Sequence, residues 1–147
     1  MKSLFSGLIF SITIMSGCAS IPQDQDAQAR ITVAAKSWGD EFHFFYIPSS
    51  GGMADSTFIA MSKSSGPSAM VKQLVSELVK GTNSNYKLAV SGPSSVKTYQ
   101  VIKDAFVLLN EKKLNHLDFM YVGAESNKEE IKSLVESAGA TFVFTAY

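Results

Sequence analysis

The alternation of helical stripes with short apolar runs over residues 65–147 constrains the fold of this chain most strongly. The first helix is predicted to open at residues 65–68, and its apolar residues recur at a spacing that places them on one face. These residues are Val71, Leu74, Val75, Leu78 and Val79. Gly81 and Asn83 follow and are expected to end this helix.

Two further helices are predicted after this one. The first opens at residues 91–94, with Pro93 expected at the first helical position, where its missing N–H group costs nothing. Its apolar positions are Val96, Tyr99, Ile102, Phe106 and Leu109. The next opens at Ser126, which forms a predicted capping box with Glu129, and Gly139 is expected to stop it. Its apolar positions are Ile131, Leu134, Val135 and Ala138.

Compact apolar runs separate these helices and predict buried strands. They occupy residues 88–90, 117–122 and 141–147. Strands that alternate with helices favour right-handed βαβ units and a parallel sheet that is covered on both faces.

The residues before this alternating part predict a different local structure. Residues 31–35 and 42–47 are β-type runs, and the turn candidate between them makes a hairpin plausible. Residues 48–52 then break regular structure with Pro and paired Gly. Residues 57–61 are interpreted as another buried strand, although periodicity alone leaves a helix open.

The predicted fold class is therefore α/β. We expect a three-layer sandwich with a mostly parallel sheet, three helices and an antiparallel edge hairpin. One domain is predicted over residues 31–147. Residues 18–30 are predicted to be a solvated linker, because Ile21 to Ala29 is polar and has no apolar period.

The N-terminus has the pattern of an export signal. Lys2 supplies a positive charge, residues 4–15 an apolar stretch, and Ser16 and Gly17 the small residues next to a cleavage site. A transmembrane helix is the alternative, but a span needs roughly 20 continuous apolar residues. The stretch is shorter and is interrupted by Ser and Gly. Residues 1–17 are therefore predicted to be a signal peptide.

The end of this segment, Met15-Ser16-Gly17-Cys18, resembles the lipobox of bacterial lipoproteins, although that family prefers Leu where Met15 stands. The resemblance implies lipid attachment to Cys18 through diacylglyceryl and acyl groups such as palmitate. It also implies a place on the periplasmic face of the outer membrane, because Ala19 and Ser20 lack the Asp that retains lipoproteins in the inner membrane. A plain secretory signal with a coincidental cysteine remains the alternative.

Composition limits the partners and the chemistry of the processed chain. Removing residues 1–17 leaves 130 residues with 12 basic and 13 acidic side chains, which gives a formal charge of −1. This balance supplies no electrostatic attraction for nucleic acid or for an anionic membrane surface. Cys18 is the only cysteine. Its acylation leaves no thiol for a disulfide, a redox centre or a Cys-based metal site.

A serine-rich rim is expected at the carboxyl edge of the sheet, where ligands bind in parallel α/β folds. Helix N-termini at that edge favour an anionic or hydroxylated ligand. The alternative is that these serines cap helices, as Ser commonly does. The candidate ligand-binding residues are Ser65, Ser68, Ser91, Ser94 and Ser126.

An aromatic cluster is the candidate surface for a protein partner. It contains Trp38, Phe44 and Phe45. Neighbouring residues of a strand point to opposite faces, so either both faces are covered or one aromatic side chain is exposed for a partner. Core packing is the alternative.

The sequence contains no recognisable catalytic motif. The patterns G-x-x-x-x-G-K-[ST], G-x-G-x-x-G, G-x-S-x-G and H-E-x-x-H are all absent. His43 with Asp55 and Ser50 or Ser56 would make a hydrolase set, but their spacing does not demand it. His116 and Asp118 are too few ligands for a metal site. No metal and no cofactor are therefore expected.

These observations predict a lipid-anchored, non-enzymatic outer-membrane lipoprotein. Its domain would be an accessory or structural component of an envelope assembly of the secretion, conjugation or pilus type, and its partners would be the membrane and an envelope protein. The alternative is a periplasmic module that binds a small polar or anionic ligand at the serine-rich rim. An envelope hydrolase built around His43 is the third hypothesis.

Overall fold

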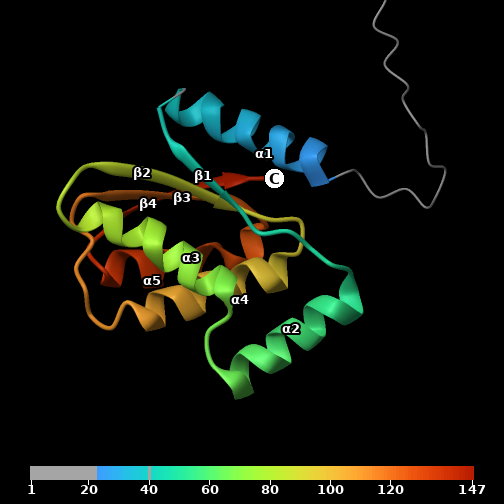
Figure 1. Ribbon diagram of the computed structural model, residues 1–147. Helices are drawn as coiled ribbons and strands as arrows, with labels where there is room; N and C mark the ends of the chain where they lie inside the picture. The colour runs from blue at the N-terminus through green and yellow to red at the C-terminus, as the bar shows by residue number, and fades with distance from the viewer. Residues whose placement is uncertain (1–22, 40) are drawn as a thin grey trace, which may run out of the picture.

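The computed structural model describes residues 23–39 and 41–147, so the predicted signal peptide and Cys18 lie outside the described residues. The structure is an α/β fold in which helices and strands alternate (Figure 1). In chain order the elements are α1 (Gln23–Trp38), β1 (His43–Tyr46), α2 (Gly52–Ser65), α3 (Ala69–Leu78), η1 (Val79–Thr82), β2 (Tyr86–Ser91), α4 (Ser95–Leu108), β3 (Leu117–Gly123), η2 (Glu125–Asn127), α5 (Lys128–Ser137) and β4 (Thr141–Ala146).

The four strands of the described residues form one parallel sheet in the order β1-β2-β3-β4. Phe44 pairs with Ala89, Ala89 with Met120, and Met120 with Val143. The predicted parallel sheet is therefore confirmed. The predicted antiparallel edge hairpin is wrong, because β1 is the edge strand and pairs in parallel with β2.

The larger core lies between the sheet and the layer formed by α3, α4 and α5 (Figure 1). The stripes that the sequence shows on these helices supply Val71, Leu74, Ile102 and Ile131, all fully buried. Each side chain of this kind contributes about 1.5–3 kcal/mol when it leaves water. The apolar spacing thus correctly predicted three helices in this part of the chain and many of the residues that they bury, although Val96 of the predicted α4 stripe is 63% exposed.

A smaller core lies on the opposite face, under α1. Ala34 of α1 is completely buried against Ala89 of β2 and against Met120 and Val122 of β3. The two alanines allow the helix to approach the sheet closely. Helix α1 therefore supplies the third layer.

The structure corrects the prediction for the start of the domain. The predicted linker over residues 18–30 is helical from Gln23 onward, and the predicted strand over residues 31–35 belongs to the same helix, α1. The β-branched residues of this segment favoured a strand, but packing on an uncovered sheet face outweighs such propensities. The described part of the chain holds five α-helices rather than three.

Three local predictions also need correction. Residues 57–61 lie in α2, not in a strand, and the helix that periodicity left open is the one that forms. Pro93 precedes the N-cap residue Ser94 instead of occupying the first helical position. Ser126 lies inside η2 instead of capping α5, which begins after Asn127. Gly139 does follow α5, with a φ of 84°.

Candidate functional site

Several polar segments meet at the carboxyl edge of the sheet. The loop of residues 47–51 leaves β1 there, and residues 91–94 leave β2 there. The N-terminus of α1 lies at the same edge, because Gln23 Nε2 donates a hydrogen bond to Ser49 O at 2.8 Å. We call this region the carboxyl edge.

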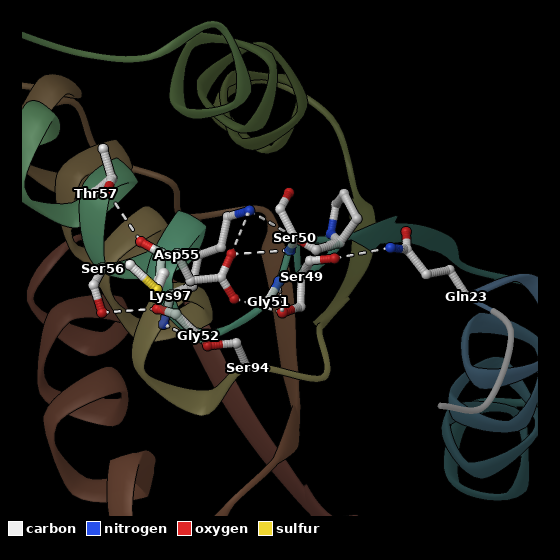
Figure 2. Close-up of polar contacts among 12 residues, drawn as sticks. Gln23, Ser49, Ser50, Gly51, Gly52, Asp55, Ser56, Thr57, Ser94 and Lys97 are labelled. Carbon is white, nitrogen blue, oxygen red and sulfur yellow. Dashed lines mark hydrogen bonds and ion pairs between the residues drawn. The ribbon is translucent and has the colours of Figure 1, made fainter. Parts of the chain in front are cut away.

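A buried ion pair between Asp55 of α2 and Lys97 of α4 holds the loop after β1 (Figure 2). Lys97 Nζ lies 3.2 Å from Asp55 Oδ1 and donates a hydrogen bond to Pro48 O at 2.7 Å. Ser49 Oγ donates to Asp55 Oδ2 at 2.5 Å, and the Ser50 N–H group donates to Asp55 Oδ1 at 3.0 Å. We call this set of contacts the Asp55–Lys97 clamp.

The electrostatics of the clamp favour the ionised form of the Asp55 carboxylate. The side chains of Lys97 and Asp55 are only 6% and 7% exposed. Burial raises the pKa of Asp55, but hydrogen bonds from Ser49, Ser50 and Lys97 outweigh it and lower this pKa below its ordinary value. A carboxylate with a lowered pKa is a weak general base near neutral pH. The clamp is therefore suited to fixing the loop rather than to proton transfer.

A second buried network joins α1 to the ends of the central strands. Arg30 Nε donates to Asp26 Oδ2 at 2.8 Å, and Arg30 Nη1 donates to Ser91 Oγ at 3.0 Å. Ser91 Oγ in turn donates to Val122 O at 2.5 Å. Tyr46 Oη donates to the same Asp26 oxygen at 2.7 Å. We call these residues the Arg30 network.

The Arg30 network also favours the protonated form of Tyr46 and contacts Tyr147, which follows β4. Burial and the hydrogen bond to Asp26 raise the pKa of Tyr46 above its ordinary value. The Arg30 guanidinium carbon lies 4.1 Å from the ring centroid of Tyr147, which is a cation–π geometry. Every charged group of the network thus has a partner inside the protein.

The predicted serine-rich rim does not form one site. Ser68 and Ser94 are helix N-caps that accept hydrogen bonds from Val71 N and Lys97 N. This is the capping role that the sequence left as the alternative. Ser91 is completely buried in the Arg30 network. Ser65 is the last residue of α2, and Ser126 is an exposed residue of η2.

The predicted aromatic surface is divided between two cores. Phe44 packs with the core under α1, and Phe45 packs with the core under the other helices. Trp38 is half-buried, and its ring stands edge-on to Phe42 with centroids 6.2 Å apart. The three residues therefore do not share one exposed surface, and the packing alternative describes them better.

The hydrolase set built around His43 is not assembled. His43 begins β1 at the amino edge of the sheet, where its ring stacks on Tyr86 with centroids 4.4 Å apart. Ser50 and Asp55 lie at the opposite edge, in the clamp. His116 and Asp118 remain an isolated pair, because residues 23–39 and 41–147 contain no group of three or more His, Cys, Asp or Glu that could hold a metal ion.

An exposed apolar surface lies where the C-terminal parts of α2 and α4 meet. Met61 of α2 and Val107 and Leu108 of α4 are all exposed. Ser62 Oγ donates a hydrogen bond to Asp104 Oδ2 and joins the two helices beside them. A hollow of about 470 Å³ opens at the same place, and Val107 and Leu108 line it. We call this region the α2–α4 surface.

Sequence reasoning missed the charged residues that build both polar networks. Arg30 falls in the predicted linker, and Lys97 belongs to none of the motifs that the sequence shows. One signal was present for the first, because Asp26 and Arg30 have the i, i+4 spacing of a helical ion pair. The partners of Lys97 come from a loop and another helix, so local spacing carries no signal for them.

Comparisons with known proteins do not assign the chain to a family. No family model, no curated protein and no solved structure matches it. In the part of the chain that the structure describes, none of the helices has both the length and the apolar character that crossing a membrane requires.

Proposed function

We propose that this chain is a lipid-anchored periplasmic lipoprotein of the outer membrane whose domain is a non-enzymatic binding module for an envelope protein. The observation that carries the binding role is the α2–α4 surface. Its large apolar side chains face solvent beside a hollow, which is the arrangement of protein interaction sites.

The state of the polar residues supports a binding role over catalysis. The charged groups of the clamp and of the Arg30 network are buried and paired with one another. Among the serines that a small ligand would use, Ser68 and Ser94 cap helices and Ser91 is buried. The exposed Ser65 and Ser126 lie on separate elements, α2 and η2. The exposed apolar side chains, in contrast, have their contact area free for another molecule.

The anchor is proposed from Cys18 and the three residues before it. These match the lipobox pattern, and processing would make Cys18 the first residue of the mature chain. Stable anchoring takes two lipid signals, since one acyl chain binds only marginally. A diacylglyceryl group and an N-terminal acyl chain on Cys18 meet that requirement.

The binding role is tested by photo-cross-linking in intact cells. A photoreactive amino acid is placed at Met61 or Val107, with Lys72 on the exposed face of α3 as the control position. We expect the first two positions to capture the same envelope protein, and Lys72 to capture at least fivefold less of it. The captured proteins are recovered through a C-terminal tag and identified by mass spectrometry.

Polar variants show whether the apolar character of the surface matters. Met61→Gln combined with Val107→Gln is expected to reduce recovery of the partner at least fivefold while the domain stays folded, and Lys72→Gln is expected to leave it unchanged. Equal capture at all three positions, or full recovery with the double variant, would contradict the α2–α4 surface as the binding site.

A further inference from the structure

The N-terminus of α1 ties the predicted anchor to one particular edge of the domain. Gln23 at the start of α1 contacts Ser49 at the carboxyl edge, whereas Trp38 at its end contacts Phe42, just before β1. Helix α1 therefore runs opposite to the strands, and Figure 1 shows its first turn beside the C-terminal end of the chain. Whatever precedes Gln23 joins the domain at the carboxyl edge.

Three large apolar side chains are exposed at that same edge. Met53 lies in the first turn of α2 after the loop that follows β1, Val96 lies in the first turn of α4 after β2, and Tyr147 follows β4. They are 90%, 63% and 47% exposed. Among the described residues they make up half of the exposed large hydrophobic side chains, and the other half forms the α2–α4 surface.

The length of chain before α1 limits how the domain can sit on a membrane. Cys18 lies five residues before Gln23, so even a fully extended chain between them spans only about 18 Å. A compact domain of this size is about 35 Å across. An anchor of that length cannot reach around the molecule, so the opposite, amino edge cannot face the bilayer.

We infer that the carboxyl edge is a membrane-contact surface, with Met53, Val96 and Tyr147 at the level of the lipid headgroups. This inference rests on the proposed lipid anchor at Cys18. The nearly balanced charge of the processed chain favours contact through these apolar side chains over attraction to anionic lipids. Tyr suits such a position, because one end of its side chain is apolar and the other is polar.

This orientation leaves the α2–α4 surface free for a protein partner. Val96 and Val107 lie eleven residues apart on α4, which corresponds to about 16 Å along the helix axis. The near end of α4 would thus contact lipid, and its far end would point into the periplasm. One helix connects the membrane-contact surface to the partner surface.

Fluorescence quenching on vesicles tests the orientation with the full lipidated chain. Acylation of Cys18 leaves no other thiol, so a single introduced cysteine can be labelled selectively. Met53→Cys and Val96→Cys probe the carboxyl edge, and Met61→Cys and Val107→Cys are matched controls at the far ends of the same two helices. The labelled proteins are reconstituted into phosphatidylcholine vesicles that contain a lipid with a nitroxide on its headgroup.

We expect quenching at positions 53 and 96 to be at least threefold stronger than at positions 61 and 107. Adding phosphatidylglycerol to the vesicles should leave this ratio unchanged. Equal quenching at all four positions, or stronger quenching at 61 and 107, would overturn the inferred orientation. All four positions are exposed, and circular dichroism confirms that each labelled variant keeps its fold.

Mass spectrometry of Cys18 separates this result from a failure of the proposed anchor. An unmodified Cys18 in protein isolated from membranes would overturn the anchor, and the orientation with it. An acylated Cys18 without the quenching difference would leave the anchor intact and overturn the orientation alone. A Cys18→Ser chain, which lacks the acyl groups, is expected to show less than one-third of the quenching at position 53.

Discussion

At the scale of single residues, Lys97 determines the geometry of the carboxyl edge. Its ammonium group contacts the carboxylate of Asp55 and the carbonyl of Pro48, which belong to a helix and to the loop before it. Its ammonium group also lies over Phe58, with Nζ 4.9 Å from the ring centroid. Lys97 therefore acts as a structural cation, a role that its position in the sequence does not indicate.

Replacing Lys97 by Met is expected to lower the free energy of unfolding by about 3–5 kcal/mol, because it leaves the Asp55 carboxylate buried without its partner. Urea unfolding followed by circular dichroism measures this change. Lys97→Met combined with Asp55→Leu is expected to recover most of the loss. The control is Lys80→Met, because the Lys80–Glu77 pair is half-exposed and its removal costs at most about 1 kcal/mol.

At the scale of elements, α1 is the helix whose position depends most on polar contacts. Among the described residues, four buried side chains make up the core beneath it, whereas the core on the opposite face of the sheet contains eighteen. Arg30 links α1 to Ser91 of β2 and, through Tyr147, to the segment after β4. The Arg30 network thus compensates for the small apolar contact area under this helix.

Arg30→Met is expected to release α1 while the rest of the fold remains. The variant leaves Asp26 buried without its cation, so local opening of the helix becomes easier. Hydrogen exchange should become at least tenfold faster over residues 23–38, with little change in β3. Thr32→Met is the control, because Thr32 is exposed on the same helix. Equal acceleration across the whole domain would contradict an independent α1.

At the scale of the whole molecule, the free energy of unfolding is expected to fall at both low and high pH. The reason is that carboxylates and tyrosines form hydrogen bonds inside the protein at the carboxyl and amino edges of the sheet. The pKa of Asp55 is lowered, and so is that of Glu77, where hydrogen bonds from Lys80 and Tyr86 outweigh the effect of burial. The pKa values of Tyr46 and Tyr86 are raised by burial and by hydrogen bonds to Asp26 and Glu77. The folded state thus favours charged carboxylates and neutral phenols.

The urea midpoint is expected to be highest between about pH 5 and pH 9. Stability from the two carboxylates is present above their unfolded pKa values of 3.8 and 4.5, and is lost as pH falls through their lower folded values. Stability from the two phenols is present below their unfolded pKa of 10.0 and is lost as pH rises above it. Asp55→Asn should reduce the loss of the urea midpoint below about pH 5. The same loss in the variant and in the unchanged protein would contradict an ionised Asp55 in the clamp.

The sequence predicted the alternating half of the chain well and its beginning poorly. Helices α3, α4 and α5 each carry a stripe of large apolar residues, and the strands between them are short apolar runs, so local pattern and final burial largely agree, with the exposed Val96 as an exception. Residues 31–35 combine β-branched residues with alanines, and this local pattern favours a strand. Only the presence of an uncovered sheet face explains why they form a helix instead.

The candidate sites, like the fold, depend partly on local sequence and partly on contacts between distant segments. Ser91 and Ser94 lie at the carboxyl edge, as expected, whereas Ser65 ends α2 away from it. Whether a serine caps a helix depends on where that helix begins. The α2–α4 surface could not be predicted, because Met61 and Val107 are far apart in the sequence and residues 57–61 were assigned to a strand. The clamp joins Asp55 to Lys97 across 42 positions, a pairing that no local spacing reveals.

The sequence by itself determined the parallel α/β class and many of the buried residues of three helices, because helical and strand periods are local properties of side-chain spacing. Only the tertiary structure decided that β1 pairs in parallel with β2, that α1 covers the second face, and that the charged residues are buried in pairs. The physical reason is that these outcomes depend on contacts between distant segments. The free energy of such contacts exists only when the whole sheet is assembled.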